Sequence, residues 1–248
     1  MLYTRKGDDG TTKDLKSGAR ERKSKSSCQT EALGALDELN SFLGLVKVKS
    51  QAIDLKAFSN ESGPEATDKM TVYDRRGSGT INCKTVSNRK ASDSINQKVQ
   101  SSTARPNRVS KPTNGSSFDL NEMDLAGVVQ WIQNALFIVQ AEVAGADKHV
   151  GQGKVTEMEG WIDSIEKLLP PIKSFFMSGG TELAALLDFS RTLARKAERR
   201  VIAGAEAGEF KIDPATLAFL NRLSSLLYAL ARLNNHKSGI TEVPPGYQ

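Results

Sequence analysis

TEALGALDELNSFLGLVKV, Thr30–Val48, is the stretch from which the fold is inferred. Four of its apolar residues recur at spacings of three, seven and three positions: Leu33, Leu36, Leu43 and Val46. These spacings place them near one face of an α-helix. A helix with one apolar face must bury that face against other elements. The stretch therefore predicts one helix of a packed helical protein.

Four further segments have the same helical character: residues 120–145, 155–169, 181–205 and 213–236. The first of them carries an apolar stripe: Val128, Ile132, Leu136 and Val139. Thr181 is suited to an N-cap and Pro214 to a first helical position. Pro170 and Pro171 are expected to end the helix before them. Because no segment alternates as a strand would, the sequence predicts an all-α, five-helix bundle.

Residues 50–118 differ from both flanks. They hold 12 serines, 11 Lys/Arg and 6 Asp/Glu, so this segment carries the entire net charge of +5. It shows no sustained apolar period. A structureless loop of this length is rare inside a compact domain. We therefore predict a disordered, low-complexity insertion at about 50–118 within a single domain spanning 1–248, which ends in a short tail at 237–248.

Composition excludes several classes of protein. The two cysteines, Cys28 and Cys83, form no zinc motif or disulfide framework, and only His149 and His236 could supply imidazole ligands. No apolar run is long enough to span a membrane. The N-terminus lacks the apolar core of a secretory signal. We expect a protein of a reducing compartment.

The N-terminal stretch TRKGDDGTT, Thr4–Thr12, has no apolar side chain. Its Gly-Asp and Asp-Gly steps favour turns whose backbone amides can converge on an anion. It is not a Walker loop, because no Gly-Lys-Ser/Thr follows at the required spacing. The alternative is a frayed chain end.

The fourth predicted helix offers a second anion site. Arg191, Arg195 and Arg199 follow one another at intervals of four, flanked by Lys196 and Arg200. A Gly pair directly precedes this helix, where amide donors and the helix dipole favour anions. The alternative is a solvated basic face.

Acidic and amide side chains are the expected partners of these bases. Asp37 and Glu38 lie between two leucines, so at least one carboxylate should lie near the apolar stripe and need an arginine partner. The alternative is an exposed acidic pair on the flank of the helix. For Asn221 and Arg222 the alternative is that both only cover the polar edge of the fifth helix.

Five blocks together resemble the PduO-type ATP:cob(I)alamin adenosyltransferases, or corrinoid adenosyltransferases. In order they are TRKGDDGTT, EALGALDELNSFLG, F-x-x-S-G-G-T, SRTLARKAERRV and FLNRLSSLLYALAR. The resemblance covers residues 2–49 and 120–235. Three departures stand out: Ser178 replaces a usual Pro, Lys196 replaces a common Arg, and Ser26-Ser27 replace frequent acidic residues. Lysine keeps the charge but loses the bidentate fork of arginine.

The resemblance implies a homotrimeric helical bundle with active sites between subunits. It implies that the 5′-deoxyadenosyl group of ATP moves to the cobalt of reduced cob(I)alamin or another corrinoid, giving adenosylcobalamin and triphosphate. Mg²⁺ would be held mainly by the ATP phosphates, with no protein ligand assigned. Further implied partners are a corrinoid reductase and an adenosylcobalamin-dependent enzyme. The expected location is the cytoplasm, or the mitochondrial matrix for a chain lacking its presequence.

The resemblance also implies roles for individual residues. The phosphate loop would be formed by Thr4, Gly7, Asp8, Gly10, Thr11 and Thr12, with Lys25 reaching the same phosphates. Further implied ATP-binding residues are Glu31, Arg191, Arg195, Glu198, Arg199 and Asn221. Asp37 would pair with Arg191 across the subunit boundary, and Phe175 would press on the lower face of the corrin and displace its lower base. Asp37, Phe175 and Arg191 are thus the implied catalytic residues.

Three alternative functions can be compared with the residues. A non-catalytic ATP or corrinoid carrier or sensor could use the same scaffold. A di-metal carboxylate bundle would need Glu-x-x-His pairs, which neither histidine provides. Nucleic-acid binding through the insertion is not expected, because its basic residues are not clustered and aromatics are sparse.

Overall fold

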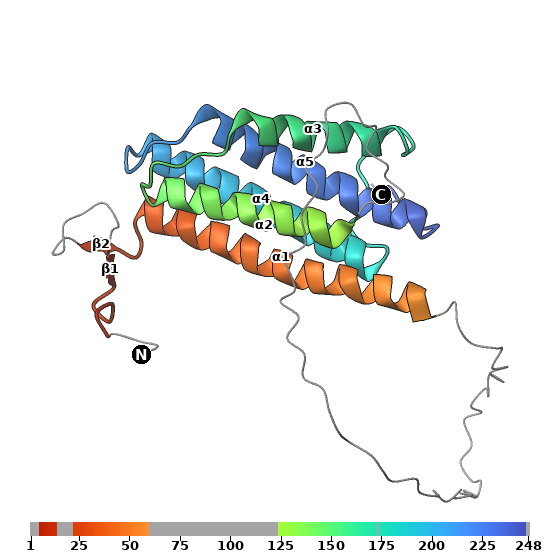
Figure 1. The fold of residues 1–248 in the computed structure, drawn as a ribbon, viewed down its shortest axis with the longest axis horizontal. Helices are drawn as coiled ribbons and strands as arrows, with labels where there is room; N and C mark the ends of the chain where they lie inside the picture. The colour runs from red at the N-terminus through yellow and green to blue at the C-terminus, as the bar shows by residue number, and fades with distance from the viewer. Residues whose placement is uncertain (1–4, 14–21, 60–123, 173, 247–248) are drawn as a thin grey trace, which may run out of the picture. The chain divides into compact units, whose positions relative to one another are not determined.

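The structure is a computed structural model that describes residues 5–13, 22–59, 124–172 and 174–246, with the backbone alone for 52–59. Within these ranges the elements are β1 (Thr11–Lys13), β2 (Arg22–Ser24), α1 (Cys28–Ser59), α2 (Leu125–Val143), α3 (Gln152–Glu166), α4 (Glu182–Glu206) and α5 (Pro214–Lys237). The helices lie side by side as a bundle (Figure 1). The predicted five-helix bundle is therefore confirmed.

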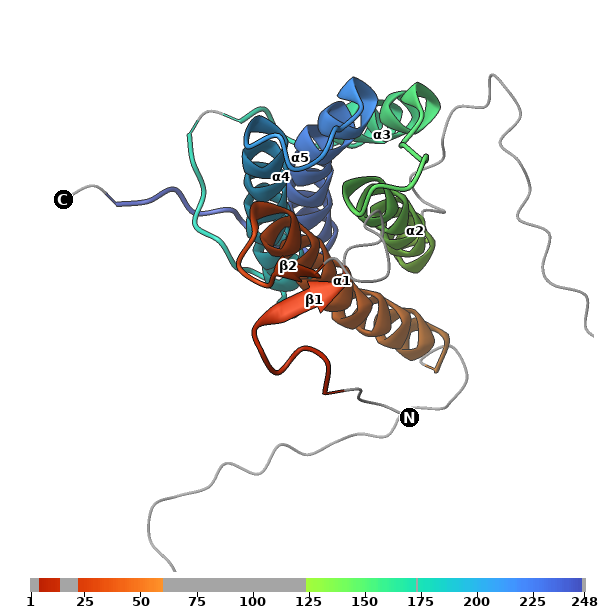
Figure 2. The ribbon, with the colours of Figure 1, turned by 90° about the vertical axis from the view of Figure 1, so that its left-hand side faces the viewer.

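Neighbouring helices run antiparallel in three packed pairs, α1 with α2, α1 with α4 and α4 with α5, whereas α3 and α5 run parallel (Figure 1). α1 packs against α2 and α4, and α5 packs against α3 and α4. The view along the bundle shows the helices grouped around a common centre (Figure 2). Trp131 of α2 and Trp161 of α3 bring those two helices together, with ring centroids 4.8 Å apart. None of the helices in the described part of the chain is long and apolar enough to cross a membrane.

The predicted apolar stripes form the core. Six of the eight predicted residues are fully buried: Leu36, Leu43, Val46, Ile132, Leu136 and Val139. Val128 is 7% exposed, and Leu33 is partly buried against the same cluster. Burying a side chain of this size stabilises the fold by about 1.5–3 kcal/mol. Burial of these faces is therefore the main force that assembles the bundle.

Helix ends follow the predicted caps. The Thr181 hydroxyl accepts from the Ala184 amide at 3.1 Å, and the Asp213 carboxylate accepts from the Ala215 amide at 2.8 Å. α3, in contrast, ends at Glu166, before the proline pair that was expected to stop it. Its last turn is closed by bonds from the Lys167 amide, so the prolines are not needed there.

α1 is longer than predicted. It continues to Ser59, into the segment assigned to the insertion. Residues 51–59 contain neither glycine nor proline, so nothing in their sequence breaks a helix that has already begun. The rest of the expected insertion, including Cys83, lies outside the described residues.

A small antiparallel hairpin precedes α1 and was not predicted. β1 pairs with β2 so that Thr11 faces Ser24. The Arg22 guanidinium fastens the pair by donating to the Thr11 carbonyl at 2.9 Å. Strands of three residues are too short to show the alternation by which a strand is recognised in a sequence.

Candidate active site

A cavity of about 650 Å³ opens between the first half of α4, the second half of α5 and the segment Ser174–Gly179. Its apolar wall is formed by Ile172, Phe175, Phe176 and Met177. Its polar wall includes Asp188, Arg191, Arg195, Ser224, Ser225 and Tyr228. A cavity of this size and mixed lining is typical of a site for a small organic ligand. Three predicted site residues, Phe175, Arg191 and Arg195, thus line one cavity.

The Gly pair shapes the turn between this segment and α4. Gly179 and Gly180 have φ values of 137° and 98°, which favour glycine. The Asn235 side chain of α5 donates to the Gly179 carbonyl at 2.9 Å and accepts from the Thr181 amide at 3.0 Å. A Cβ on Gly180 would overlap that side chain. The turn is therefore fixed to α5, with Ser178 exposed in the position of the usual proline.

Phe175 lies at the mouth of the cavity and is 83% exposed. Met177, which lines the same wall, is 65% exposed. Large apolar side chains gathered in an exposed wall mark a surface that meets a ligand or partner. This wall suits the flat apolar face of a large ring system.

Arg191 is held by Asp188, one turn earlier on α4. Its Nε donates to Asp188 Oδ1 at 2.6 Å, and the two side chains are 29% and 11% exposed. A charge-assisted bond of this length fixes the direction of the guanidinium. The pair therefore presents an oriented arginine to the cavity.

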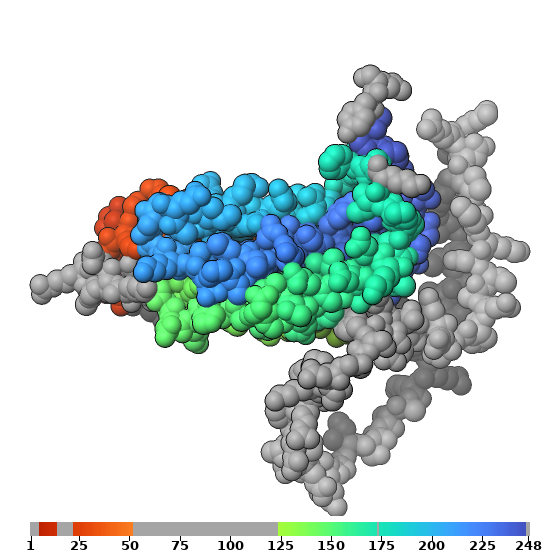
Figure 3. Space-filling model, turned by 90° about the horizontal axis from the view of Figure 1, so that it is seen from above, coloured from red at the N-terminus to blue at the C-terminus, as the bar shows by residue number. Residues whose placement is uncertain are grey.

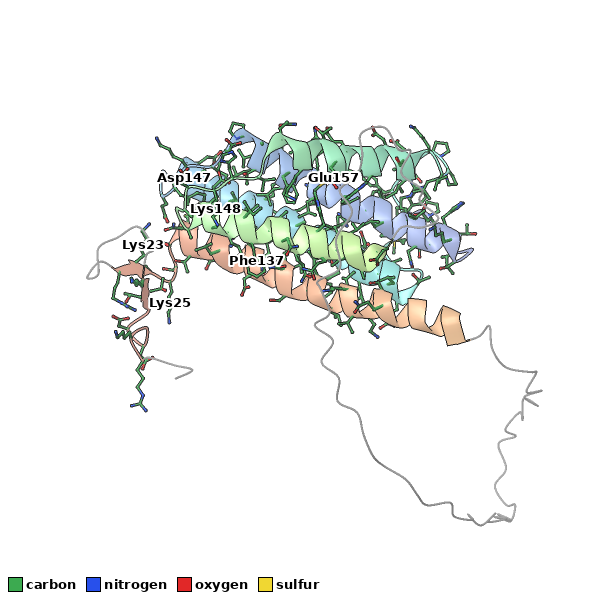
Figure 4. All side chains as sticks on the ribbon, in the orientation of Figure 1. Lys23, Lys25, Phe137, Asp147, Lys148 and Glu157 are labelled. Carbon is green, nitrogen blue, oxygen red and sulfur yellow. The ribbon has the colours of Figure 1, made fainter. Side chains whose placement is uncertain are left out.

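Asp37 does not meet Arg191 within one chain. It is exposed in a shallow groove between α1 and α2, beside Gly34 and Phe137. Phe137 points outward from α2 above α1 (Figure 4) and is 62% exposed. The expectation that Asp37 or Glu38 needs an arginine beside the apolar stripe is wrong for the single chain, because both carboxylates are exposed to solvent.

The other bases of α4 fall into two groups. Lys196 pairs with Glu38 at 2.5 Å and Arg200 with Glu31 at 3.8 Å, both at the surface between α4 and α1. A third pair on this seam is Lys49–Glu182 at 2.6 Å. Exposed pairs contribute only about 0–1 kcal/mol each. Glu31 accordingly lies on the outer seam and not in the cavity.

Arg195 and Arg199 form the second group. Both are exposed, and neither has an ion pair or side-chain hydrogen bond among the described residues. They follow Arg191 along α4 from the cavity toward the other end of the helix. We call Arg191, Arg195 and Arg199 the arginine row; it leads out of the cavity, and among the described residues the charges of Arg195 and Arg199 are not paired.

Glu198 and Asn221 join α4 to α5. Asn221 Nδ2 donates to Glu198 Oε1 at 3.0 Å, and Arg222 donates to Asn221 Oδ1 at 2.7 Å. Arg222 also donates to Glu159 of α3 at 2.9 Å. The two predicted ATP-binding residues are thus in contact with each other, at the surface beside the arginine row.

The predicted phosphate loop is folded by its own polar groups. Lys25 Nζ donates to the Gly7 carbonyl at 2.7 Å, and the Lys25 amide donates to the Gly10 carbonyl at 2.9 Å. Gly10 has a φ of 78°, as its turn requires. Figure 4 shows Lys25 on the hairpin. The structure therefore places Lys25 against this loop, while Thr4 lies outside the described residues.

Asp9 holds the end of the loop. Its carboxylate accepts from the Thr11 hydroxyl at 2.7 Å and from the Thr11 amide at 3.0 Å. The hydroxyl bond, followed by the amide bond, holds the pKa of Asp9 below its usual value. Asp8 and Gly7 precede it, and Thr12 continues into β1. Asp8 is exposed and its carboxylate has no hydrogen bond within the described ranges.

The loop and the cavity lie at opposite ends of α4. The Glu209 carboxylate, just beyond α4, accepts from the Cys28 and Gln29 amides at 3.1 and 2.9 Å, so the start of α1 lies beside the end of α4. The hairpin leads directly into α1, whereas the cavity adjoins the start of α4. Because α4 has 25 residues, these ends are about 37 Å apart at 1.5 Å per residue. Within one chain, Arg191 of the cavity therefore lies about 22 Å along α4 from the end beside the loop, and Arg195 and Arg199 lie between them.

Several cavity residues were missed in the sequence. Asp188, Tyr228, Arg232 and Glu242 line the cavity, and Asn235 holds its turn. Burial raises the pKa of the Tyr228 hydroxyl. No spacing marks these residues, since they come together only when α4, α5 and the C-terminal residues pack. Among the described residues, no group of three or more His, Cys, Asp or Glu side chains could hold a metal ion.

Comparison with known proteins identifies relatives of the chain. The family described as cobalamin adenosyltransferase matches residues 2–65 and 107–234. The match leaves out residues 66–106, a shorter stretch than the insertion expected at about 50–118. The corrinoid adenosyltransferase of Mycobacterium tuberculosis is 34% identical over 142 residues, covering 53% of this chain and 74% of that protein. That of Bacillus subtilis is 29% identical over 246 residues, covering 98% and 90%.

A solved structure has the same fold. It is that of a variant PduO-type ATP:corrinoid adenosyltransferase from Lactobacillus reuteri complexed with cobalamin and ATP. It superposes with a TM-score of 0.64 at 21% identity, covering 100% of this chain and 97% of the other. Since the family match spans most of the chain, including the loop, the Gly-Gly turn and the arginine row, this chain belongs to the cobalamin adenosyltransferase family.

Proposed function

We propose that this protein transfers the 5′-deoxyadenosyl group of ATP to the cobalt of a reduced corrinoid, and that the cavity beside α4 is where the reaction takes place. The observation that carries the proposal is the cavity itself, in which the exposed Phe175 ring faces the same space as the oriented Arg191 guanidinium. An apolar wall accepts the corrin ring, and the arginine row attracts phosphate.

The residues in the cavity suit this chemistry. In the reaction the Co(I) electron pair attacks C5′, a Co–C bond forms, and the C5′–O bond breaks with triphosphate as the leaving group. Co(I) is itself a strong nucleophile, so no side chain has to be activated. The protein must instead hold the reactants in line and stabilise the negative charge that develops on the triphosphate. Arg191, fixed by Asp188, and the unpaired Arg195 supply positive charge for that purpose.

The separation of the two predicted anion sites supports a site shared between subunits. A phosphate chain bound beside Arg191 in the cavity would lie about 22 Å along α4 from the end that adjoins the loop of its own chain. The loop of a second copy can complete the site. We therefore propose a homotrimer in which each loop, with Lys25, serves a neighbouring cavity, and in which Asp37 of one subunit pairs with Arg191 of the next. The exposed Phe137 beside Asp37 provides apolar surface for such a contact.

Mg²⁺ fits this arrangement as a companion of ATP. It is usually bound by one or two carboxylates together with substrate phosphates. Asp8, exposed on the loop, is the carboxylate available for that role, since Asp9 is occupied by Thr11. When bound, Mg²⁺ would neutralise part of the triphosphate charge.

Phe175 has a separate role in the proposal. Its ring would cover the lower face of the corrin and keep water and the lower base away from cobalt. A cobalt without a lower ligand is easier to reduce from Co(II) to Co(I). The exposure of the ring supports this role, because a ring that only packed the core would be buried.

The test is an anaerobic incubation of the protein with Mg-ATP and chemically reduced cobalamin. We expect the absorbance spectrum of adenosylcobalamin and one triphosphate released per product. The matched controls are Arg191→Ala, which should lose most activity, and Arg200→Ala, on the α1 seam, which should retain it. Binding of ATP and cobalamin by folded protein without product would contradict the proposal and identify a carrier or sensor.

A further inference from the structure

Arg232 of α5 connects three parts of the cavity wall. Its guanidinium pairs with Glu242 at 2.9 Å, donates to the Pro170 carbonyl at 3.0 Å, and lies 5.2 Å from the centroid of the Phe176 ring. Its side chain is only 6% exposed, and that of Glu242 is 19% exposed. Neither residue is among the predicted site residues.

Glu242 belongs to the residues after α5, Ile240–Gly246, which we call the tail. The tail lies beside the segment Ser174–Gly179, and the Met177 amide donates to the Val243 carbonyl at 2.8 Å. Figure 2 shows the two stretches on the same side of the bundle, and Figure 3 shows them near the start of α4. The tail therefore supports the outer side of the segment that carries Phe175.

Apolar burial does not explain why the tail stays there. Ile240 and Val243 are 41% and 61% exposed, so they bury little surface. A nearly buried arginine, in contrast, is costly to leave without a partner. Glu242 is the carboxylate that pairs with Arg232 in the described part of the chain. The ion pair and the Met177–Val243 bond thus hold the tail.

The segment in turn depends on the same contacts. Phe175 is 83% exposed and so has little packing of its own to fix its ring. The next two residues are anchored instead, Phe176 on the Arg232 guanidinium and Met177 on the tail backbone. The position of Phe175 is thus set through its neighbours.

We propose that Arg232 and Glu242 are positioning residues for the corrinoid, which act by holding the Phe175 segment against the lower face of the ring. This inference rests on the proposed function. It predicts that loosening the tail harms corrinoid binding and Co(II) reduction while leaving ATP binding intact, because the phosphate-binding side chains lie on α4 and in the N-terminal loop.

The test compares Glu242→Gln with a chain ending after Ile240, both of which keep every apolar core residue in place. The matched control is Glu182→Gln, which removes the surface ion pair with Lys49. The Glu182 side chain is far more exposed than that of Glu242. For each variant we would measure KM and kcat for cobalamin and Kd for ATP. The electron paramagnetic resonance spectrum of bound cob(II)alamin, recorded with ATP present, would give the fraction that is four-coordinate. Thermal unfolding verifies that each variant is folded.

With a corrinoid reductase supplying the electron that converts Co(II) to Co(I), we expect Glu242→Gln and the shortened chain to lower kcat/KM for cob(II)alamin about tenfold, the order expected from losing a charge-assisted bond. The four-coordinate fraction should fall in parallel. ATP affinity should stay within about twofold, as should every parameter of Glu182→Gln. In a Phe175→Ala background, Glu242→Gln should have little further effect, because coupled residues give non-additive losses.

Two results would overturn the inference. One is a wild-type spectrum and rate in both tail variants. The other is an additive loss in the Phe175→Ala background, which would show that Glu242 acts independently of that ring. A wild-type protein that makes no adenosylcobalamin would instead contradict the proposed function, and the four-coordinate signal would still test the tail.

Discussion

Gly180→Ala tests the turn that joins the cavity to α4. Gly180 has a φ of 98°, and a Cβ placed there would overlap the Asn235 side chain. The backbone strain costs about 1–3 kcal/mol. Displacing Asn235 also breaks its bonds to the Gly179 carbonyl and the Thr181 amide, each worth about 0.5–1.5 kcal/mol. We therefore expect a loss of about 2–6 kcal/mol in the free energy of unfolding.

Gly179→Ala is the matched control. Its φ of 137° carries similar strain, but a Cβ there meets nothing within 4 Å, so it should cost only about 1–3 kcal/mol. Urea unfolding of both variants, followed by circular dichroism, measures the difference. In an Asn235→Ala background the excess cost of Gly180→Ala should disappear. If Gly180→Ala is no worse than Gly179→Ala, the contact with Asn235 does not govern this turn.

Two further predictions concern the α1 end and the subunit boundary. Glu209→Gln should lower the free energy of unfolding at pH 7 by about 1 kcal/mol, because it weakens the cap on α1, whereas the exposed Glu206→Gln should not. Hydrogen bonds from the α1 amides, that of Gln29 foremost, hold the pKa of Glu209 below its usual 4.5. The stabilisation by this carboxylate is therefore present above pH 4.5 and is lost as the pH falls through the folded-state pKa. The free energies of unfolding of the wild-type protein and Glu209→Gln, measured in urea, should therefore converge in acid. Asp37→Asn and Arg191→Ala should each lose most of kcat/KM and weaken the trimer in sedimentation, with the double variant no worse than either. Additive losses with intact trimers would mean that these two side chains do not meet between subunits.

Local signals were sufficient for most of the fold. The apolar stripe Val128–Val139 and the caps Thr181 and Asp213 act within a few residues of chain, so their spacing alone identifies the helices. The arginines of α4 and the Gly pair were visible for the same reason. The short hairpin was not, because three-residue strands form only when their partner is present.

The sequence by itself thus determined the five helices, their apolar faces and the chemistry of the loop and the arginine row. Tertiary packing decided which charges pair. Arg191 is joined by Asp188 within the chain, Lys196 and Arg200 take the α1 glutamates, and Arg232 takes Glu242 from the tail. The physical reason is that the spacing of apolar residues in the sequence shows which face of a helix is apolar. The partner of a charged side chain depends instead on the distances between elements that are remote in the chain.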